Sequence, residues 1–574
     1  MKFSEMVPYS YDQLSRCGYV LYHGILRRSA RYGGEGRLYF SVFGFDHLHF
    51  SHGRYDIAIP LSRYCVYMNY MLRYLRRYTL APVAICCGIS SDTFLESKEL
   101  PMFTADEVRK NDGTNGKPMF VTFRGGVHDI TEFRKNHPGG AYIDQAAGGD
   151  VESFWNIWAY HYLSKKVLDT LEETRIGNLA PSSTEVPDIN VIDPYSSEPY
   201  RDETQMKVLT MKPFTSETKP SVLGDAYLTP AEALYVRNHA PVPQYMDAAT
   251  HTIEFGIHGQ LESEEMSLSD ISRHFDQKSV TSVLQCAGNR AAEDIAATGP
   301  SAFSGTPFEN IESGMVGNVK WGGVWLREVL TRTFPGQCSE VQGHLTEKID
   351  NPWHVIFRGT DGYATSVPLA IVLDPKIDAL LATQMNDCPL TPDHGYPVRV
   401  VLPGIAGARS VKWLESISLS RSPSEDPWNS YYYRHADGSH IQFLPQQAII
   451  LSPTKGEVVS ATDGTVRVRG VAYSAGGDMS AEISDVEVSV DGGEKWVSAV
   501  LMKGELRPDD AHVSSLHGWV RFAADVKVKT SGSTTVCCRA RDSAGNCQPK
   551  VSVKQRGYLY NGWNTVDFTT NLVK

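Results

Sequence analysis

The sequence has no hydrophobic run long enough to cross a membrane. A transmembrane helix needs about 20 consecutive apolar residues, and the nearest candidate, residues 79–89, is much shorter. Cysteines are also sparse and irregular, because only ten occur in 574 residues and none forms a C-x-x-C pair. This spacing favours neither a disulfide framework nor a common zinc site. We expect a protein without a membrane span, in a compartment that tolerates free thiols.

Positive charge is also in short supply. The formal net charge is -11, and beyond the N-terminus there is no basic stripe with interleaved aromatic residues. A nucleic-acid-binding role is therefore excluded as the main function. With 41% hydrophobic and 21% charged residues the composition is that of an ordinary globular chain, and its length predicts three or four domains.

Acidic residues are missing altogether between positions 57 and 91. Within this window, residues 71–91 carry Arg73, Arg76 and Arg77 among apolar residues, a pattern typical of a mitochondrial presequence. We expect residues 1–98 to be a basic N-terminal extension that contains this presequence-like segment. One hypothesis makes Met71 the true start and residues 1–70 an upstream extension without a folded role. The alternative is a basic, poorly ordered tail. A mitochondrial location, in the intermembrane space, is predicted, with the cytoplasm as the alternative.

A regular pattern begins near residue 99. Residues 118–123 predict a strand, Gly125-Gly126 a tight turn and residues 127–130 the returning strand. Two histidines, His137 and His161, follow 24 residues apart, each beside a turn or helix end and among aromatic residues. Two neutral imidazoles facing an apolar slot would fill both axial positions of a haem iron, which could then only transfer electrons. The plain alternative is a turn at His137 and an ordinary helical residue at His161.

The motif QCAGNR at 285–290 places one cysteine after an apolar strand and before turn residues. Cys286 would then lie at the mouth of a loop, where a thiolate can bind a soft or thiophilic metal. The alternative is a small buried residue. Other clusters, at 234–243, 357–369 and 393–414, combine Arg, His or Lys with Gly and Pro at strand ends. Each alone could be a surface turn, but together they suggest a metal cofactor with an anionic tail.

Residues 425–574 alternate apolar and polar positions with turns such as Asp491-Gly492-Gly493. This period of two predicts antiparallel strands in a β-sandwich. Cys537 and Cys538 are adjacent on one such strand, face opposite sides and do not pair with each other.

The ordered motifs DPYSSEPYRD, VRNHAPVP, QCAGNR, DHGYPVR and GARSVKWL resemble the sulfite oxidases of the molybdopterin oxidoreductase family, and residues 100–180 resemble cytochrome b5. The resemblance implies an α+β multidomain fold. Its expected parts are a cytochrome b5-like haem domain (99–180), a linker (181–193), a mixed α+β molybdopterin-binding domain (194–424) and an immunoglobulin-like dimerisation domain (425–574).

The resemblance also implies a role for each motif residue. Cys286 would bind molybdenum, Arg237 would bind sulfite, and Tyr433, five residues after Trp428, would donate a hydrogen bond to the substrate. Each of these could instead be structural. His137 and His161 would bind the iron of haem b. The remaining residues implied to hold Mo-molybdopterin are Tyr235, Val236, Asn238, His239, Asp361, His394, Arg399, Ser410, Val411 and Lys412, and Arg290 would add positive charge near the metal.

Three positions depart from the family pattern. Ala291 follows Arg290 where the family usually has a second arginine, Ile311 stands near the place of a pocket tryptophan, and Ser515 near that of a further arginine. A pocket that lacks two guanidiniums should bind a dianion more weakly, by about 1.5–3 kcal/mol for each contact.

The leading hypothesis is a homodimeric sulfite oxidase that passes electrons from molybdenum through the haem to cytochrome c. One alternative is a molybdenum reductase of nitrate or another small oxyanion or N-oxide. The haem module comes first and no flavin or nicotinamide fingerprint follows, which favours the oxidase. The other alternative is a haem electron carrier with a degenerate molybdenum domain.

Overall fold

The computed structural model comprises two compact units, Met1–Ser97 and Lys98–Lys574. In the first unit, β1 (His47–His52) and β2 (Tyr55–Pro60) form an antiparallel hairpin that the sequence analysis did not anticipate. The presequence-like segment 71–91 lies outside the described residues. These are 47–52, 55–60, 100–137, 140–155, 161, 164–180, 193–344, 353–474, 481–502, 514–528 and 531–573.

Residues 100–180 form a small α+β module around a four-stranded sheet, in the order β3-β6-β5-β4. Apolar residues of the sheet and helices, such as Val121, Ile130 and Phe154, pack into one core. Thr104 caps the first helix through a capping box with Glu107, which fixes where that helix begins. The elements are β3 (Met102–Phe103), α3 (Ala105–Lys110), β4 (Phe120–Phe123), β5 (Gly126–Asp129), η3 (Phe133–Asn136), η4 (Gly140–Ala146), α4 (Glu152–Trp155), α6 (Lys165–Glu173) and β6 (Arg175–Leu179).

The hairpin of this module is present, but its turn lies one residue earlier than predicted. Arg124 and Gly125 occupy the turn with φ angles of 47° and 79°, while Gly126 already belongs to β5. Two consecutive left-handed residues are typical of a type I′ turn, which matches the twist of the flanking strands.

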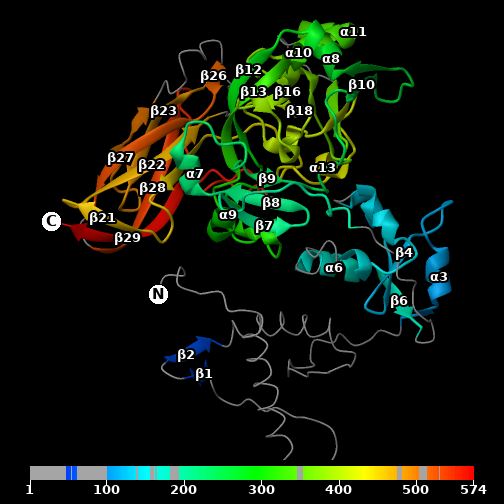
Figure 1. Cartoon of the computed structure of the whole chain (residues 1–574), viewed down its shortest axis with the longest axis horizontal. Helices are drawn as coiled ribbons and strands as arrows, with labels where there is room; N and C mark the ends of the chain where they lie inside the picture. The colour runs from blue at the N-terminus through cyan, green and yellow to red at the C-terminus, as the bar shows by residue number, and fades with distance from the viewer. Residues whose placement is uncertain are drawn as a thin grey trace, which may run out of the picture. The chain divides into compact units, whose positions relative to one another are not determined.

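The central part of the chain combines three sheets with short helices (Figure 1). A five-stranded sheet has the order β11-β10-β19-β14-β15, a second sheet runs β17-β16-β13-β12-β26 with β18 beside β16, and a third runs β7-β8-β9. Their strands are β7 (Met206–Met211), β8 (Phe214–Thr218), β9 (Val236–Arg237), β10 (Thr252–Ile257), β11 (Ser263–Ser267), β12 (Lys278–Gln285), β13 (Val316–Trp325), β14 (His354–Gly359), β15 (Ala364–Pro368), β16 (Leu380–Met385), β17 (Cys388–Pro389), β18 (Arg399–Val401) and β19 (Leu414–Ser420).

Helices of this region pack their apolar residues against the five-stranded sheet, where Leu326, Val329 and Val372 join Val355 and Ile417 in one core. The helices are α7 (Pro220–Asp225), α8 (Leu268–His274), α9 (Ala291–Thr298), η5 (Pro307–Asn310), α10 (Leu326–Thr333), α11 (Pro335–His344), α12 (Leu369–Leu373), η6 (Pro392–His394), η7 (Gly407–Arg409) and α13 (Pro427–Ser430).

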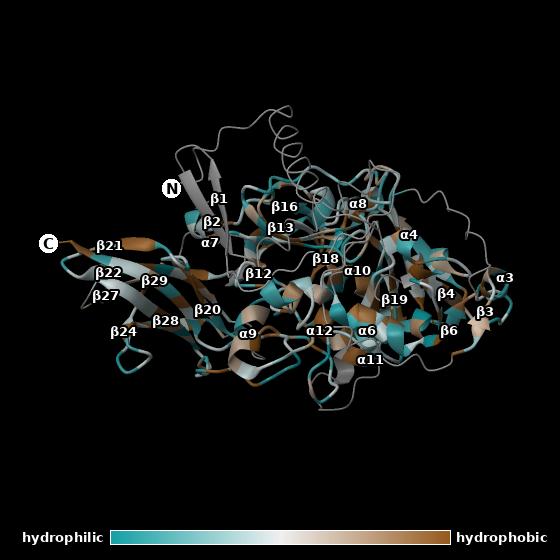
Figure 2. Ribbon diagram, turned by 90° about the horizontal axis from the view of Figure 1, so that it is seen from below, coloured by the Kyte–Doolittle hydropathy of each residue, from teal (hydrophilic) through white to brown (hydrophobic). Residues whose placement is uncertain are grey.

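The C-terminal part is the expected β-sandwich. Val468 and Phe522 from one side meet Val486 and Val536 from the other in a single core, and hydrophobic and hydrophilic segments alternate along the strands in Figure 2. The strand order is β24-β23-β28-β29-β21-β22-β27-β25, with β20 beside β22. The strands are β20 (Gln447–Ser452), β21 (Val458–Thr462), β22 (Thr465–Tyr473), β23 (Ile483–Ser489), β24 (Val497–Ser498), β25 (Val500–Met502), β27 (Val520–Lys527), β28 (Gly532–Asp542) and β29 (Asn564–Val573).

One strand of the C-terminal part leaves the sandwich. Strand β26 (Ser514–His517) pairs in parallel with β12 and completes the central sheet that carries the cysteine loop. The Leu559 N–H also donates to the Ala287 carbonyl (2.8 Å), and the Tyr473 hydroxyl bonds to the side chain of Gln285. The C-terminal part therefore supports the backbone on both sides of Cys286.

Candidate active site

Strand β12 ends at a sharp turn that presents Cys286, as the motif predicts. The Asn289 N–H closes this turn on the Cys286 carbonyl (3.0 Å), and the Asn289 side-chain oxygen accepts from the Met315 N–H (3.0 Å). Gly288 packs closely here, because a Cβ atom would lie 3.0 Å from Cζ of Phe303. Cys286 is only partly buried and lines a pocket. The structure therefore does not enclose it in the core, as the alternative supposed.

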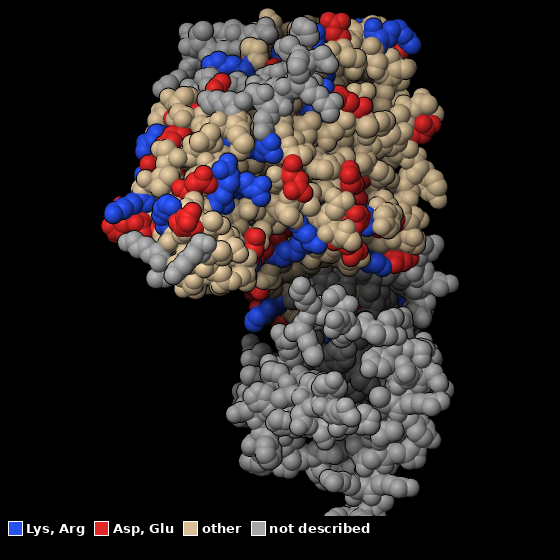
Figure 3. All heavy atoms as spheres, turned by 60° about the vertical axis from the view of Figure 1, so that its left-hand side comes forward, with Lys and Arg blue, Asp and Glu red and all other residues tan. Residues whose placement is uncertain are grey.

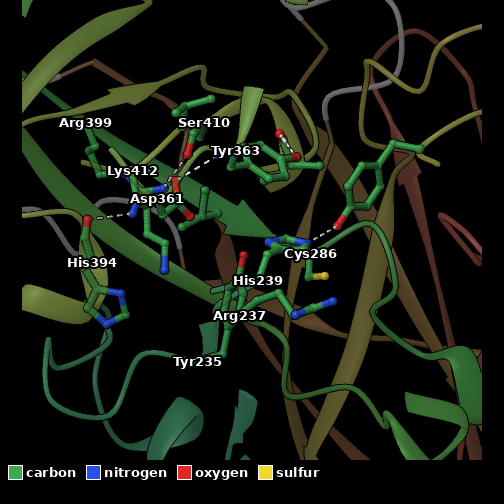
Figure 4. Close-up of a pocket in the computed structure, with 15 residues that line it drawn as sticks. Tyr235, Arg237, His239, Cys286, Asp361, Tyr363, His394, Arg399, Ser410 and Lys412 are labelled. Atoms are coloured by element: carbon green, nitrogen blue, oxygen red, sulfur yellow. Dashed lines mark hydrogen bonds between the residues drawn. The ribbon is translucent and has the colours of Figure 1, made fainter. Parts of the chain in front are cut away.

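The residues predicted to hold the cofactor come together in that pocket although they are far apart in sequence (Figure 4). The Cys286 sulfur lies near Arg237 and His239, while Lys412, Arg399 and His394 gather on the other side. The lining residues are Tyr235, Arg237, His239, Leu284, Cys286, Asp361, Tyr363, His394, Arg399, Gly407, Ala408, Ser410, Val411, Lys412 and Tyr433.

Two predicted residues, Val236 and Asn238, do not line the pocket, and the alternation of an extended segment explains why. Side chains on such a segment point to opposite faces in turn, so Tyr235, Arg237 and His239 face the pocket. Val236 instead packs in a small core, while the Asn238 amide nitrogen donates to a carboxylate oxygen of Asp393 (3.0 Å). Asn238 also accepts from the Lys412 ammonium, so it orients a lining residue from behind.

One end of the pocket is built to hold an anion. The Arg399 guanidinium is buried and donates to the carbonyls of His394 (3.0 Å) and Ser410 (2.9 Å). The Lys412 ammonium donates to the Asp393 carbonyl (2.8 Å). The Asp393 carboxylate is engaged by Arg201 through two bonds of 2.7 Å. These bonds hold the Arg399 and Lys412 side chains in place. Because the bonds go to neutral carbonyls, both positive charges can still attract an anion.

The pKa values at this end are those of a crowded, buried cationic site. Burial, and then the Arg399 cation, lower the pKa of Lys412 to about 7 against the opposing effect of Asp393. Burial likewise lowers the pKa of His394 to about 3 and that of Arg399 to about 10. An incoming anion would raise these pKa values, since an opposite charge nearby favours the charged form of each group.

Anion binding at this end should therefore depend on pH. Sulfate is a suitable probe for the cofactor-free protein, because it stays a dianion from pH 6 to 8.5. We expect its affinity to fall about tenfold over that range, because the pKa of free Lys412 is about 7 and a bound dianion favours the ammonium form. Isothermal titration calorimetry measures this. The Lys412→Met variant should bind weakly at both ends of the range, and a pH-independent affinity of the unmodified protein would refute this role of Lys412.

The other end of the pocket combines Arg237 with His239 and Tyr433. The His239 Nε2 atom lies 3.0 Å from the Tyr433 hydroxyl, and the His239 ring packs on Trp428 with centroids 4.0 Å apart. Burial, and then the Arg237 cation, lower the pKa of His239 far below its usual value, while burial raises that of Tyr433. Both groups are therefore neutral near pH 7 and can share or relay a proton.

Arg409 positions Tyr433, a role that the sequence analysis missed. Its guanidinium is fully buried and donates to the carbonyls of Tyr433 (3.1 Å) and Ile441 (2.8 Å) and to the Asn429 amide (2.6 Å). Tyr433 has a φ of 22°, which a non-glycine residue adopts only when its surroundings hold it there. Arg409 lies within the quoted motif GARSVKWL, but the motif alone does not tell which way its side chain points.

Arg290 does not add charge near the metal position, contrary to the prediction. Its guanidinium binds the Glu293 carboxylate at 2.6 and 2.9 Å, the Gln447 amide oxygen at 2.8 Å and the Trp563 carbonyl at 3.1 Å. These partners turn the side chain away from the pocket and toward the C-terminal part. Arg290 therefore joins two domains, and its charge is neutralised by Glu293.

A second guanidinium does reach the outer cavity in front of Cys286, but it comes from Arg556. Arg556 lines this cavity together with Arg237, Tyr558 and Cys286, and its Nη1 atom lies 3.5 Å from the Tyr431 carbonyl. The sequence analysis looked for this cation near Ser515, on β26, whose side chain lies outside the described residues. The available signal was the pairing of a cation with glycine in QRGYLY, as in the other pocket motifs.

The aromatic contribution near Arg237 also comes from an unexpected position. Ile311 is almost fully buried and packs in the core beneath the cysteine loop. Phe308, three residues earlier, places its ring 4.6 Å from the Arg237 guanidinium carbon. A guanidinium stacked on an aromatic face keeps its edge free for an anion.

The residues 100–180 contain a second site, between His137 and His161. Their ring centroids are 6.3 Å apart and their planes differ by 16°. Two metal–nitrogen bonds of about 2.0 Å plus two ring radii fill a gap of roughly 6 Å, so one iron atom fits between them. Apolar residues including Val121, Ile143 and Phe154 line the surrounding slot, which suits a porphyrin.

The donor set of the main pocket fits a pterin cofactor that carries a metal. A soft sulfur ligand lies at one end, and Arg399, Lys412 and Ser410 offer cationic and hydroxyl groups at the other. The fold and the site define a molybdopterin-binding oxidoreductase with a b5-type haem module.

Three family models match the chain and agree with this class. Residues 239–428 match the oxidoreductase molybdopterin binding domain, residues 439–571 the Mo-co oxidoreductase dimerisation domain, and residues 104–180 the cytochrome b5-like heme/steroid binding domain. The predicted cofactors, Mo-molybdopterin and haem b, are those of the first and third models, and the second supports the predicted homodimer.

The chain belongs to the sulfite oxidase family. It is 34% identical over 496 residues to the mitochondrial sulfite oxidase of Drosophila melanogaster, covering 82% of this chain and 81% of that protein. Identity to the human mitochondrial sulfite oxidase is also 34%, over 81% of this chain and 84% of that protein. The NAD(P)H nitrate reductase of Hordeum vulgare is 31% identical, covering 61% of this chain and 40% of that protein.

These relatives confirm the predicted family and favour the oxidase over the reductase. The fly and human relatives are named as mitochondrial sulfite oxidases, in agreement with the predicted mitochondrial location. None of the helices that the structure describes is long and apolar enough to span a bilayer. The face shown in Figure 3 carries lysine, arginine and acidic side chains interspersed.

Proposed function

We propose that the chain oxidises sulfite to sulfate at the Cys286 pocket and passes the electrons through the haem between His137 and His161 to cytochrome c in the intermembrane space. The observation that carries this proposal is the convergence of the Cys286 thiol, the Arg237 guanidinium and the cationic Arg399–Lys412 end in one pocket. The C-terminal part would form the homodimer.

Each group has a task that follows from its position. Arg399, Ser410 and Lys412 would hold the phosphate of the pterin, and Asp361, Tyr235, His394 and Val411 would enclose its rings. Cys286 would bind molybdenum as a thiolate, although burial raises the pKa of its thiol in the metal-free pocket, because coordination removes the proton. When bound, the molybdenum–pterin group supplies two-electron oxygen-atom transfer.

The outer cavity would collect and orient the substrate. Arg237, stacked on Phe308, and Arg556 can bind sulfite oxygens by charge-assisted hydrogen bonds. Tyr433 keeps its phenol proton because burial raises its pKa. It can donate that proton to a substrate oxygen while its own oxygen accepts from His239. Oxidation of sulfite to sulfate takes its oxygen from water and releases two protons and two electrons, and the haem can accept the electrons one at a time.

The test is the steady-state reduction of cytochrome c by the purified holoenzyme with sulfite. A parallel assay measures the oxidation of a reduced viologen with nitrate. We expect turnover with sulfite and little with nitrate. Turnover with nitrate alone, at full molybdenum and haem content, would replace the proposal by the reductase.

Arg237→Met should weaken sulfite capture. The loss of one charge-assisted contact of about 1.5–3 kcal/mol corresponds to a fall in kcat/KM of about 10- to 150-fold. Arg556→Met should lower it only about threefold, because this guanidinium lies near the exposed rim, where solvent screens its charge. The exposed Arg273 on α8 offers a matched control, and Arg273→Met should leave kcat/KM unchanged. Equal values for Arg237→Met and the control would remove Arg237 from substrate binding.

A further inference from the structure

The lining of the outer cavity in front of Cys286 combines positive charge with aromatic surface. Arg237 and Arg556 supply the positive charge. Phe303 and Phe308, both half-buried, supply the aromatic surface, and the Phe308 ring lies against the Arg237 guanidinium. Such a lining suits a ligand with an anionic end and an apolar substituent, since a site that selects a fully oxygenated dianion would surround it with donors.

Phe303 is held in this wall by several independent contacts. The Ala302 N–H donates to the Arg556 carbonyl (3.0 Å), and the Thr306 hydroxyl donates to the Phe303 carbonyl (2.7 Å). The Phe303 ring meets Tyr558 edge to face at 5.2 Å. A Cβ atom on Gly557 would lie 2.8 Å from this ring. The ring is therefore wedged between the cysteine loop and the segment that carries Arg556.

The charge facing the cavity is correspondingly limited. The charge of Arg290 is neutralised by its ion pair with Glu293, and Ala291, the next residue, is buried in the core. Among the described residues that line this cavity, Arg237 is the guanidinium that the Cys286 pocket also encloses, whereas Arg556 lies at the exposed rim, where solvent screens its charge. The single charge of a monoanion matches the one enclosed guanidinium.

We propose that the same site also oxidises small alkanesulfinates to alkanesulfonates, an inference that rests on the proposed oxidation of sulfite. A sulfinate carries one negative charge, keeps the lone pair on sulfur and has a carbon where sulfite has its third oxygen. The reaction is R–SO2⁻ + H2O → R–SO3⁻ + 2 H⁺ + 2 e⁻. One S–O bond forms from the sulfur lone pair, the C–S bond stays intact, and the two electrons leave by the route that sulfite oxidation uses. The oxygens bind the guanidiniums and the alkyl group packs on Phe303.

The experiment compares methanesulfinate and ethanesulfinate with sulfite as substrates of the holoenzyme. Cytochrome c reduction gives the rates, and mass spectrometry identifies the sulfonate. We expect methanesulfonate as product and a kcat/KM for ethanesulfinate no lower than that for methanesulfinate. Turnover of sulfite without any sulfonate would overturn the inference while leaving the proposed function intact. Turnover of neither substrate would overturn both.

A variant locates the alkyl contact. Phe303→Ser should lower the ratio of kcat/KM for ethanesulfinate to that for sulfite about tenfold, the range for one group in an apolar pocket. Phe275→Ser is the matched control, because Phe275 is also half-buried but packs against the Arg332 side chain of α10. Binding of ethanesulfonate and of sulfate, measured by calorimetry, gives a readout that does not need turnover. A ratio unchanged by Phe303→Ser in both kinetics and binding would show that the alkyl group does not contact this ring, which overturns the inference.

Discussion

Replacing Cys286 with serine is expected to abolish sulfite oxidation, with a fall in kcat of at least about a thousandfold. Such a fall corresponds to about 4 kcal/mol of transition-state stabilisation. The reason is the chemistry of the ligand, because a thiolate is a soft donor that metals deprotonate readily, whereas a serine hydroxyl is hard and keeps its proton. The cysteine loop itself should be preserved, since its turn is closed by backbone groups and by Asn289.

Three measurements separate loss of chemistry from loss of structure in this variant. Steady-state kinetics gives kcat, metal analysis gives the molybdenum content, and the visible spectrum reports the haem module, which should be unaffected. Cys388→Ser is the matched control, because Cys388 is an exposed residue of β17 and does not line the pocket. Cys286→Ser with ordinary turnover would show that its sulfur is not the metal ligand.

His161→Ala should disconnect the two redox sites without disabling the first. The variant loses one of the two imidazoles that face each other across the 6.3 Å gap, so the haem loses its six-coordinate state or is not retained. Reduction of cytochrome c should fall by about a hundredfold or more. Reduction of ferricyanide, a small acceptor that can take electrons at the Cys286 pocket, should remain.

The ratio of the two activities is the informative quantity for His161→Ala. A general loss of stability lowers both activities together, whereas loss of the haem lowers only the first. His274→Ala, on the exposed end of α8, is the control and should keep the ratio of the unmodified protein. Cytochrome c reduction that survives in haem-free His161→Ala would mean that electrons bypass this module.

The sequence predicted local features well and spatial partners less well. A strand followed by Cys-Ala-Gly-Asn is visible as a turn that exposes a sulfur, and the structure has that turn. The sequence alone predicts that Arg237 points to the face opposite that of Val236 and Asn238, because side chains alternate along an extended segment. Only the structure of β9 shows which of the two faces lines the pocket. The hairpin turn lies at 124–125 and not at the predicted 125–126, because Arg124 adopts the left-handed conformation that glycine usually occupies.

The errors concern contacts between distant segments. Arg290 was expected beside the metal because it follows the cysteine closely, yet Glu293, Gln447 and Trp563 determine where it points. Arg556 lies 270 positions after Cys286 and reaches the cavity only because the C-terminal part packs on the cysteine loop. Charge and spacing in a sequence do not reveal such partners, since they arise from the tertiary fold.

The most direct test of the central claim is to mix oxidised holoenzyme with sulfite under anaerobic conditions and follow the haem spectrum by stopped flow. The account predicts that the haem becomes reduced within the time of one turnover in the unmodified protein and stays oxidised in Cys286→Ser. A haem that remains oxidised in unmodified enzyme with full molybdenum and haem content would contradict it.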